Sequence, residues 1–384
     1  MFLLKNLSIF FKYFFKARWV IRLPKKNKFV LVDGIYNPFL KYIKKHYFTI
    51  LHRRGEEINF SILLKCLLKL KFTTLDYCDE FIKHVSPRLI LTAFDYHTIF
   101  YKLSKKTGIK TLLLQKGKRA TTENIIRNSN WYFSKNSKKK NFVDYFMVFN
   151  SAVKKFYSKK VSGDFFEIGS FENNFTKPDL KKQIKEIVFI SNYSTKDEIN
   201  KHKINKGENE NIVAFHLNEL AKKNNIKFNI LPRNRIYPDL LNGELDFYNK
   251  ILKNNFKFIL NRNKTSYELL LNYKYIFASY SNLAQECLVK GTRAGFISVK
   301  SKENPVSMYR FGQFEGLKKD GLFWTSSYKL NLKEINRVFN FVTKIKYSTW
   351  IKKTKPYYKK IMIFDYKNKI FKKIIKKYIK PNEK

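Results

Sequence analysis

The sequence predicts an α/β protein of two domains, each built on a mainly parallel β-sheet with helices on both faces. Its 384 residues exceed what one ordinary hydrophobic core accommodates, so two domains of similar size are expected. Short apolar runs typical of buried strands alternate with segments whose apolar residues recur at helical spacing. This alternation begins twice, near Lys28 and near Ile187, which predicts one domain in each half of the chain.

The first half shows the alternation clearly. A strand at 87–95 runs into a helix at 98–106, Gly108 ends that helix, and another strand follows at 109–115. Residues 163–174 close this half, and residues 176–184 are predicted to link the domains. The remaining strands are predicted at 28–33, 48–51, 73–76 and 144–149, and the remaining helices at 60–70 and 151–157.

The second half repeats the pattern after residue 186. Residues 197–211 are polar and predict a loop. The predicted strands are 187–192, 226–231, 256–260, 275–278 and 294–298, and the predicted helices are 212–224, 245–254, 266–271 and 283–289.

Both ends of the chain are predicted to form basic amphipathic helices. Residues 2–16 place three lysines on one stripe and bulky apolar side chains opposite, and residues 352–384 carry thirteen lysines and two acids. Such helices lie in a membrane interface or pack on the body of their own protein, and both remain open. The predicted parts are an N-terminal helix (1–27), two Rossmann-like domains (28–175 and 186–345) and a Lys-rich C-terminal helix (346–384).

Composition excludes several classes of protein. No apolar run reaches the roughly 20 residues that a membrane-spanning helix requires. No secretory signal is recognisable, because lysines interrupt the first apolar stretch. Three widely spaced cysteines indicate reduced thiols in a cytoplasmic protein, and six scattered histidines without HxxxH or HxH pairs predict no metal site.

A net charge of +48 indicates an anionic partner: nucleic acid, an anionic membrane surface or an anionic substrate. The abundance of Lys, Asn, Ile and Phe also fits the background of an A/T-rich genome, which would explain part of the charge. The chain has no RNP1-type segment, helix-turn-helix spacing or zinc finger, so nucleic acid is not expected as a partner.

The stretch from Ser279 to Gly291 organises the second half. A buried strand ends at Ala278, a hydroxyl-rich turn follows, and one helix leads to Gly291. Backbone N–H groups at the helix start form an anion site together with the side chains of Ser279, Ser281 and Asn282. Glu286, about one turn into the helix, is expected to accept hydrogen bonds from a sugar or ribose. The alternative is an ordinary N-capped helix with a surface glutamate.

Ligands of open α/β sheets bind outside the carboxyl ends of the strands, so polar residues there are the candidates. In the first half, Asp95 and His97 follow one predicted strand, and Gln115, Lys116, Gly117 and Arg119 end the next. In the second half, Arg233 follows the strand at 226–231. The alternatives are that Asp95 only caps a helix and that His97 and Arg233 only meet solvent.

Two such domains facing each other across a cleft are the layout of a GT-B glycosyltransferase. Residues 87–119, 143–174, 266–298 and 310–325 resemble bacterial surface carbohydrate biosynthesis proteins, and the likeness spans roughly residues 28–342. The Ser-rich turn and its helix also resemble the donor site of the CDP-glycerol glycerophosphotransferases. Two departures stand out: Lys116 precedes Gly117 where the family usually has Asn, and Asn282 and Ala284 replace the usual Thr and Gly.

The resemblance implies a GT-B-like enzyme that transfers a sugar, or sugar-like group, from a nucleotide-sugar donor in surface polysaccharide or lipopolysaccharide biosynthesis. The first domain would bind a lipid-linked or glycan acceptor, with Asp95 or His97 as the base, and Arg233 would contact the donor diphosphate. No metal and no cofactor is expected, because a helix dipole and basic residues can hold the leaving diphosphate. The location implied is cytoplasmic and peripheral, on the inner face of the cytoplasmic membrane. A catalytically inactive GT-B scaffold and a nucleic-acid-binding protein remain the alternatives.

Overall fold

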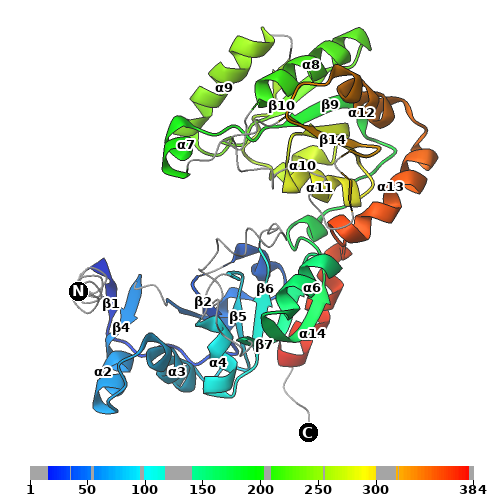
Figure 1. Cartoon of the computed structure of the whole chain (residues 1–384). Coiled ribbons are helices and arrows are strands. Elements are labelled where there is room, and N and C mark those ends of the chain that lie inside the picture. Colours follow the sequence, from blue (N-terminus) through cyan, green and yellow to red (C-terminus); the bar gives the residue numbers. More distant parts are fainter. Residues whose placement is uncertain are drawn as a thin grey trace. The chain divides into compact units, whose positions relative to one another are not determined.

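The computed structural model describes residues 16–34, 36–52, 56–95, 99–116, 141–202, 209–253, 256–299, 317–318 and 320–379. Within this part the chain forms two compact domains (Figure 1). The first domain contains residues 16–116, 141–172 and 368–379, and the second contains residues 173–367. The boundary at Glu172 and Asn173 therefore lies slightly before the segment predicted to link the domains.

The first domain is organised around a parallel sheet of six strands in the order β3-β2-β5-β6-β7-β8. Every residue of β2, β5 and β6 is buried, as expected where helices cover both faces of a parallel sheet. Residues 29–32, 89–92 and 111–114 thus lie in one sheet, which confirms the predicted α/β architecture. Its strands are β2 (Phe29–Val32), β3 (Phe48–Leu51), β5 (Leu89–Thr92), β6 (Thr111–Leu114), β7 (Asn141–Val148) and β8 (Val161–Glu167).

Four α-helices and a small second sheet accompany the six-stranded sheet in the described residues of the first domain up to residue 172. The helices are α2 (Phe60–Leu68), α3 (Thr74–Val85), α4 (Phe100–Thr107) and α6 (Ser151–Ser158). A parallel pair, β1 (Arg18–Val20) and β4 (Glu57–Asn59), lies next to α2 and was not predicted. The strand predicted at 73–76 is wrong, because the Thr73 side chain accepts a hydrogen bond from the backbone N–H of Asp76 and so caps α3.

The second domain also has a six-stranded parallel sheet, in the order β11-β10-β9-β12-β13-β14. Its strands are β9 (Ile184–Ile190), β10 (Phe228–Leu231), β11 (Lys257–Phe258), β12 (Tyr273–Ala278), β13 (Arg293–Val299) and β14 (Trp324–Ser327). Its helices are α7 (Lys196–His202), α8 (Glu210–Lys223), α9 (Pro238–Leu252), α10 (Ser266–Leu270), α11 (Asn282–Val289), α12 (Leu332–Lys344) and α13 (Tyr347–Ile361). Helix α7 occupies the start of the segment predicted as a loop.

The Lys-rich C-terminus is not one helix but two, and they belong to different domains. Helix α13 is part of the second domain, whereas α14 (Lys369–Ile379) packs in the first. There Phe371 stacks on Phe39 with ring centroids 5.3 Å apart, and the hydroxyls of Tyr378 and Tyr145 are 2.8 Å apart. The apolar face of α14 is therefore covered by its own protein, the second of the two possibilities left open for the terminal helices. The predicted N-terminal helix falls on residues 1–15, outside the described residues.

No helix in the described ranges combines the length and apolar character needed to cross a membrane.

Candidate functional site

The start of α11 has the local structure that the sequence predicts. Ser281 is the N-cap: its backbone is extended, and its Oγ accepts a hydrogen bond from the N–H of Ala284 at 3.4 Å. Beside it, Oγ of Ser279 and Oδ1 of Asn282 are buried without a hydrogen-bond partner among the described residues. The strand β12, which ends at Ala278, thus delivers two unsatisfied oxygens to the N-terminus of a helix.

The same feature recurs along the carboxyl edge of the second sheet. Buried side-chain atoms that lack a hydrogen-bond partner within the described chain also follow β9 and β10 and end β13 and β14. They are Nδ2 of Asn192, Nδ2 of Asn234, Oγ of Ser298 and Oγ of Ser326. Ala278, Ile190, Leu231, Phe296 and Trp324 lie side by side in the register of the sheet. Each of the four residues follows the position of its own strand in this row by no more than three residues. We call these four and the two beside α11 the polar edge.

Leaving one such group unsatisfied costs about 1–3 kcal/mol, so buried polar groups in proteins almost always have partners. Six of the twelve such atoms among the described residues lie at this edge, where a bound polar ligand would supply their partners. The sequence of the turn already indicated the two residues beside α11, Ser279 and Asn282. The sequence does not indicate Asn234, Ser298 or Ser326, because only the strand register brings them to the same level.

Two buried glutamates fix the loops of the polar edge. The carboxylate of Glu210 accepts from the N–H of Asn192 at 2.9 and 3.0 Å and from the hydroxyl of Tyr248 at 2.8 Å. Glu244 accepts from the N–H groups of Arg233 and Asn234 at 2.8 and 2.9 Å. Burial, and then the charge of Glu210, raises the pKa of Tyr248 well above its usual value. Helices α8 and α9 thus hold the loops after β9 and β10 through charge-assisted bonds.

Arg233 lies in the second of these loops, but its guanidinium is already engaged. It forms a bidentate ion pair with Glu198 of α7, with both N–O distances 2.7 Å, and donates to the backbone oxygen of Tyr193. Its contact with a donor diphosphate stays a prediction. The sequence does not indicate this ion pair, because it predicts a loop where α7 lies.

Glu286 lies in α11 but not on its surface, since only 4% of the residue is exposed. Its backbone oxygen accepts from Nδ2 of Asn173, the first residue of the second domain, at 3.2 Å. The alternative of an ordinary surface glutamate therefore does not hold, and its contact with a sugar stays a prediction. The next residue, Cys287, is also buried, which raises the pKa of its thiol to about 12.

In the first domain, Asp95 and Gln115 follow the neighbouring strands β5 and β6 and are both buried. The hydroxyl of Tyr157 donates to Oδ2 of Asp95 at 2.6 Å, and Oε1 of Gln115 accepts from the N–H of Phe149 at 3.1 Å. Both residues thus support the edge of the sheet. Lys116 is exposed, with Nζ 5.5 Å from the ring centroid of Tyr36.

The remaining sequence candidates, His97, Gly117 and Arg119, lie outside the described residues. Within the described ranges, no group of three or more His, Cys, Asp or Glu side chains could hold a metal ion.

Residues 112–379, more than half of the chain, match the model of a family described as "putative O-antigen biosynthesis protein". The chain belongs to this family. The match confirms the resemblance to surface carbohydrate biosynthesis proteins on which the sequence was interpreted. None of the curated proteins matches the chain.

Among solved structures, the chain is similar to the spinosyn forosaminyltransferase SpnP. The TM-score is 0.50 and the identity 11%, over 93% of this chain and 100% of that chain. This likeness confirms the GT-B-like fold class. Lower scores relate it to the wall teichoic acid polymerase TagF (TM-score 0.48, 13% identity, 92% of this chain and 89% of that chain). A glycosyltransferase from Rickettsia africae ESF-5 follows (TM-score 0.46, 14% identity, 91% and 89%).

Proposed function

We propose that this O-antigen biosynthesis protein transfers a sugar, or a sugar-like group, from a nucleotide-activated donor to a lipid-linked or glycan acceptor. The family and the fold class support this reaction type. The observation that carries it is the polar edge, where six buried side-chain atoms without a partner among the described residues follow or end five neighbouring strands, and the middle one of these strands leads into α11.

The donor diphosphate would bind at the start of α11. Backbone N–H groups of the first turn point away from the helix body, and the helix dipole favours negative charge there. Oγ of Ser279 and the amides of Asn192 and Asn234 are the candidates to bind the remaining polar groups of the donor. Because these groups stabilise a leaving diphosphate directly, we propose a reaction that needs no metal ion.

The acceptor hydroxyl needs a base within hydrogen-bond reach. Asp95 is fully buried and accepts from Tyr157, so we assign it a supporting role and assign the base to His97, two residues later in the chain. We further propose that the protein associates peripherally with the inner face of the cytoplasmic membrane, in keeping with its charge of +48.

A catalytically inactive scaffold is the second candidate. The ion pair that occupies Arg233 favours it, as do the departures at Lys116 and Asn282 from the family pattern.

A screen of nucleotide sugars by thermal unfolding tests the proposal. A cognate donor at about 100 times its dissociation constant should stabilise the protein by roughly 2.7 kcal/mol. Release of free nucleotide diphosphate when an acceptor extract is added would then separate enzyme from scaffold. Absence of stabilisation by every nucleotide sugar, against a positive control protein, would contradict the proposal.

A further inference from the structure

Helix α2 has two apolar faces: one is packed, and the other is largely exposed, although Phe60 keeps an edge contact with the ring of Trp19 at a centroid distance of 6.3 Å. Ile62 and Cys66, one turn apart, are buried, and the helix contacts α3. Phe60, Leu64 and Leu68 recur at every fourth position on the opposite side and are exposed. A helix of a soluble domain ordinarily presents polar residues there, so this face calls for an explanation.

The exposed surface continues past the end of the helix. Leu70 and Phe72 are more than 70% exposed, and Leu67 lies beside Leu64 and Leu68 on the open face. We call Phe60, Leu64, Leu67, Leu68, Leu70 and Phe72 the α2 patch. At the start of α2, Oγ of Ser61 donates to the backbone oxygen of Ile21 at 2.6 Å, and Ile21 is itself exposed.

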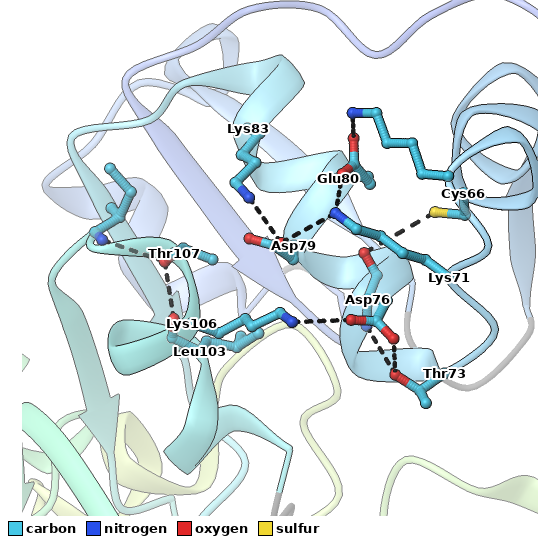
Figure 2. A network of polar contacts seen from close by, with 12 residues as sticks. Cys66, Lys71, Thr73, Asp76, Asp79, Glu80, Lys83, Leu103, Lys106 and Thr107 are labelled. Carbon is cyan, nitrogen blue, oxygen red and sulfur yellow. Dashed lines mark hydrogen bonds and ion pairs between the residues drawn. The ribbon is translucent and has the colours of Figure 1, made fainter.

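Ion pairs made by α3 and by the segment that follows α2 neutralise the acids of this region (Figure 2). Lys69 and Lys71 contact the two oxygens of Glu80 at 2.8 and 2.6 Å. Asp76 and Asp79 are paired with Lys106 and Lys83, each at 2.9 Å. The ion pairs also hold the segment that follows α2 against α3, and so fix the position of the patch residues in this segment.

The rim of the patch keeps an excess of positive charge. Lys65 lies on α2 itself, the backbone oxygen of Arg22 accepts from Nδ2 of Asn59 at the start of α2, and Lys25 and Lys26 follow further along the same segment. All four are exposed, and none forms an ion pair with a described acid. Bulky apolar side chains within a basic rim match the headgroup region of an anionic membrane, where lipid tails receive the apolar groups and phosphates attract the lysines.

A second copy of the chain fits the patch less well. Two copies meeting through this face would bring Lys65 and Arg22 of each close to those of the other, and like charges would repel. Helix α14 does not provide an alternative membrane-binding surface, because its apolar face is buried in the first domain.

We propose that the α2 patch is the surface by which the first domain inserts into an anionic membrane. This inference names the surface for the membrane association proposed above, and it is tested without substrate, so its outcome is independent of transferase activity.

The first test is flotation of the full chain with vesicles of equal parts phosphatidylcholine and phosphatidylglycerol. The double variant Leu64→Ser, Leu68→Ser should bind these vesicles at least about tenfold more weakly. It removes two leucine side chains that would be partly buried in the membrane. The control Leu240→Ser, Leu332→Ser removes two leucines of the second domain that are also exposed, at 42% and 47%, and should bind like the wild type. Thermal unfolding establishes that both variants are folded. Lys65→Glu should weaken binding to these vesicles but not to phosphatidylcholine alone.

The second test locates the inserted residues. The native cysteines, Cys66, Cys78 and Cys287, are all buried, so a fluorophore on Leu68→Cys reports one site. Its emission should shift to the blue on vesicle binding, and the same label on Leu240→Cys should not respond. Equal binding by the double variant, or an unshifted label at residue 68 on bound protein, would overturn the inference and leave the membrane association to another segment. Concentration-dependent dimers that the double variant abolishes would also overturn it, in favour of a second copy.

Discussion

The hydroxyl of Tyr157 on α6 donates a 2.6 Å hydrogen bond to Oδ2 of Asp95, the residue three positions beyond the end of β5, and both side chains are buried. The bond joins a helix to the carboxyl edge of the first sheet. Asp95, which the sequence offered as a catalytic base, thus supports that edge, and its part in catalysis stays untested.

Tyr157→Phe removes the hydroxyl and keeps the ring. Hydrogen bonds to charged acceptors contribute about 1.5–3 kcal/mol, so the free energy of unfolding should fall by about that amount. Urea unfolding measures it, with Tyr328→Phe as the control, since Tyr328 is exposed. A loss no larger than that of the control would contradict a structural role for this bond.

The acid stability of the first domain should depend on Glu80. Hydrogen bonds from Lys69, and then from Lys71, lower the pKa of its carboxyl from 4.5 to about 2. Because the folded-state pKa is the lower one, this stabilisation is complete above about pH 4.5 and is lost as the pH falls towards 2. Glu80→Gln should cost about 1 kcal/mol at neutral pH, since Lys69 is half exposed, and the deficit should shrink as the pH falls. A deficit that stays constant from neutral pH to pH 2 would contradict the role assigned to the two lysines.

Arg233 and Glu198 distinguish an enzyme from a scaffold. If Arg233 contacts a diphosphate, Arg233→Ala should weaken binding of the nucleotide diphosphate about tenfold, whereas Glu198→Gln should tighten or preserve it by releasing the guanidinium. Titration calorimetry on the three proteins measures both. Equal affinity of all three would show that the ion pair is only structural.

Local chemistry in the sequence predicts local structure well in this protein. Ser281 caps α11, as in the alternative of an N-capped helix, because capping depends on residues within one turn. The buried strands β2, β5 and β6 were found because parallel strands covered on both faces read as continuous apolar runs. The prediction of a strand at 73–76 failed because a threonine such as Thr73 is as common at a helix N-cap as in a strand.

Contacts between distant residues could not be predicted. Glu210 binds the N–H of Asn192, 18 residues away, and nothing in either segment signals that pairing. The basic amphipathic pattern of α14 predicts a helix but not what covers it, and the cover proves to be Phe39 and Phe171 of the first domain. The sequence of α2 likewise does not show which leucines are exposed, because its apolar residues would suit burial of either face of the helix.

The central claim is that the start of α11 binds the diphosphate of a nucleotide-activated donor, and Asn282→Asp tests it most directly. A carboxylate in the first turn favours the free helix by about 0.3–1 kcal/mol but repels a bound diphosphate. The matched control is Asn331→Asp, which makes the same change at the N-cap of α12.

Titration calorimetry with the donor identified in the screen should show at least about tenfold weaker binding for Asn282→Asp, no change for Asn331→Asp, and undiminished thermal stability in both. Unchanged donor affinity in a folded Asn282→Asp protein would contradict the claim.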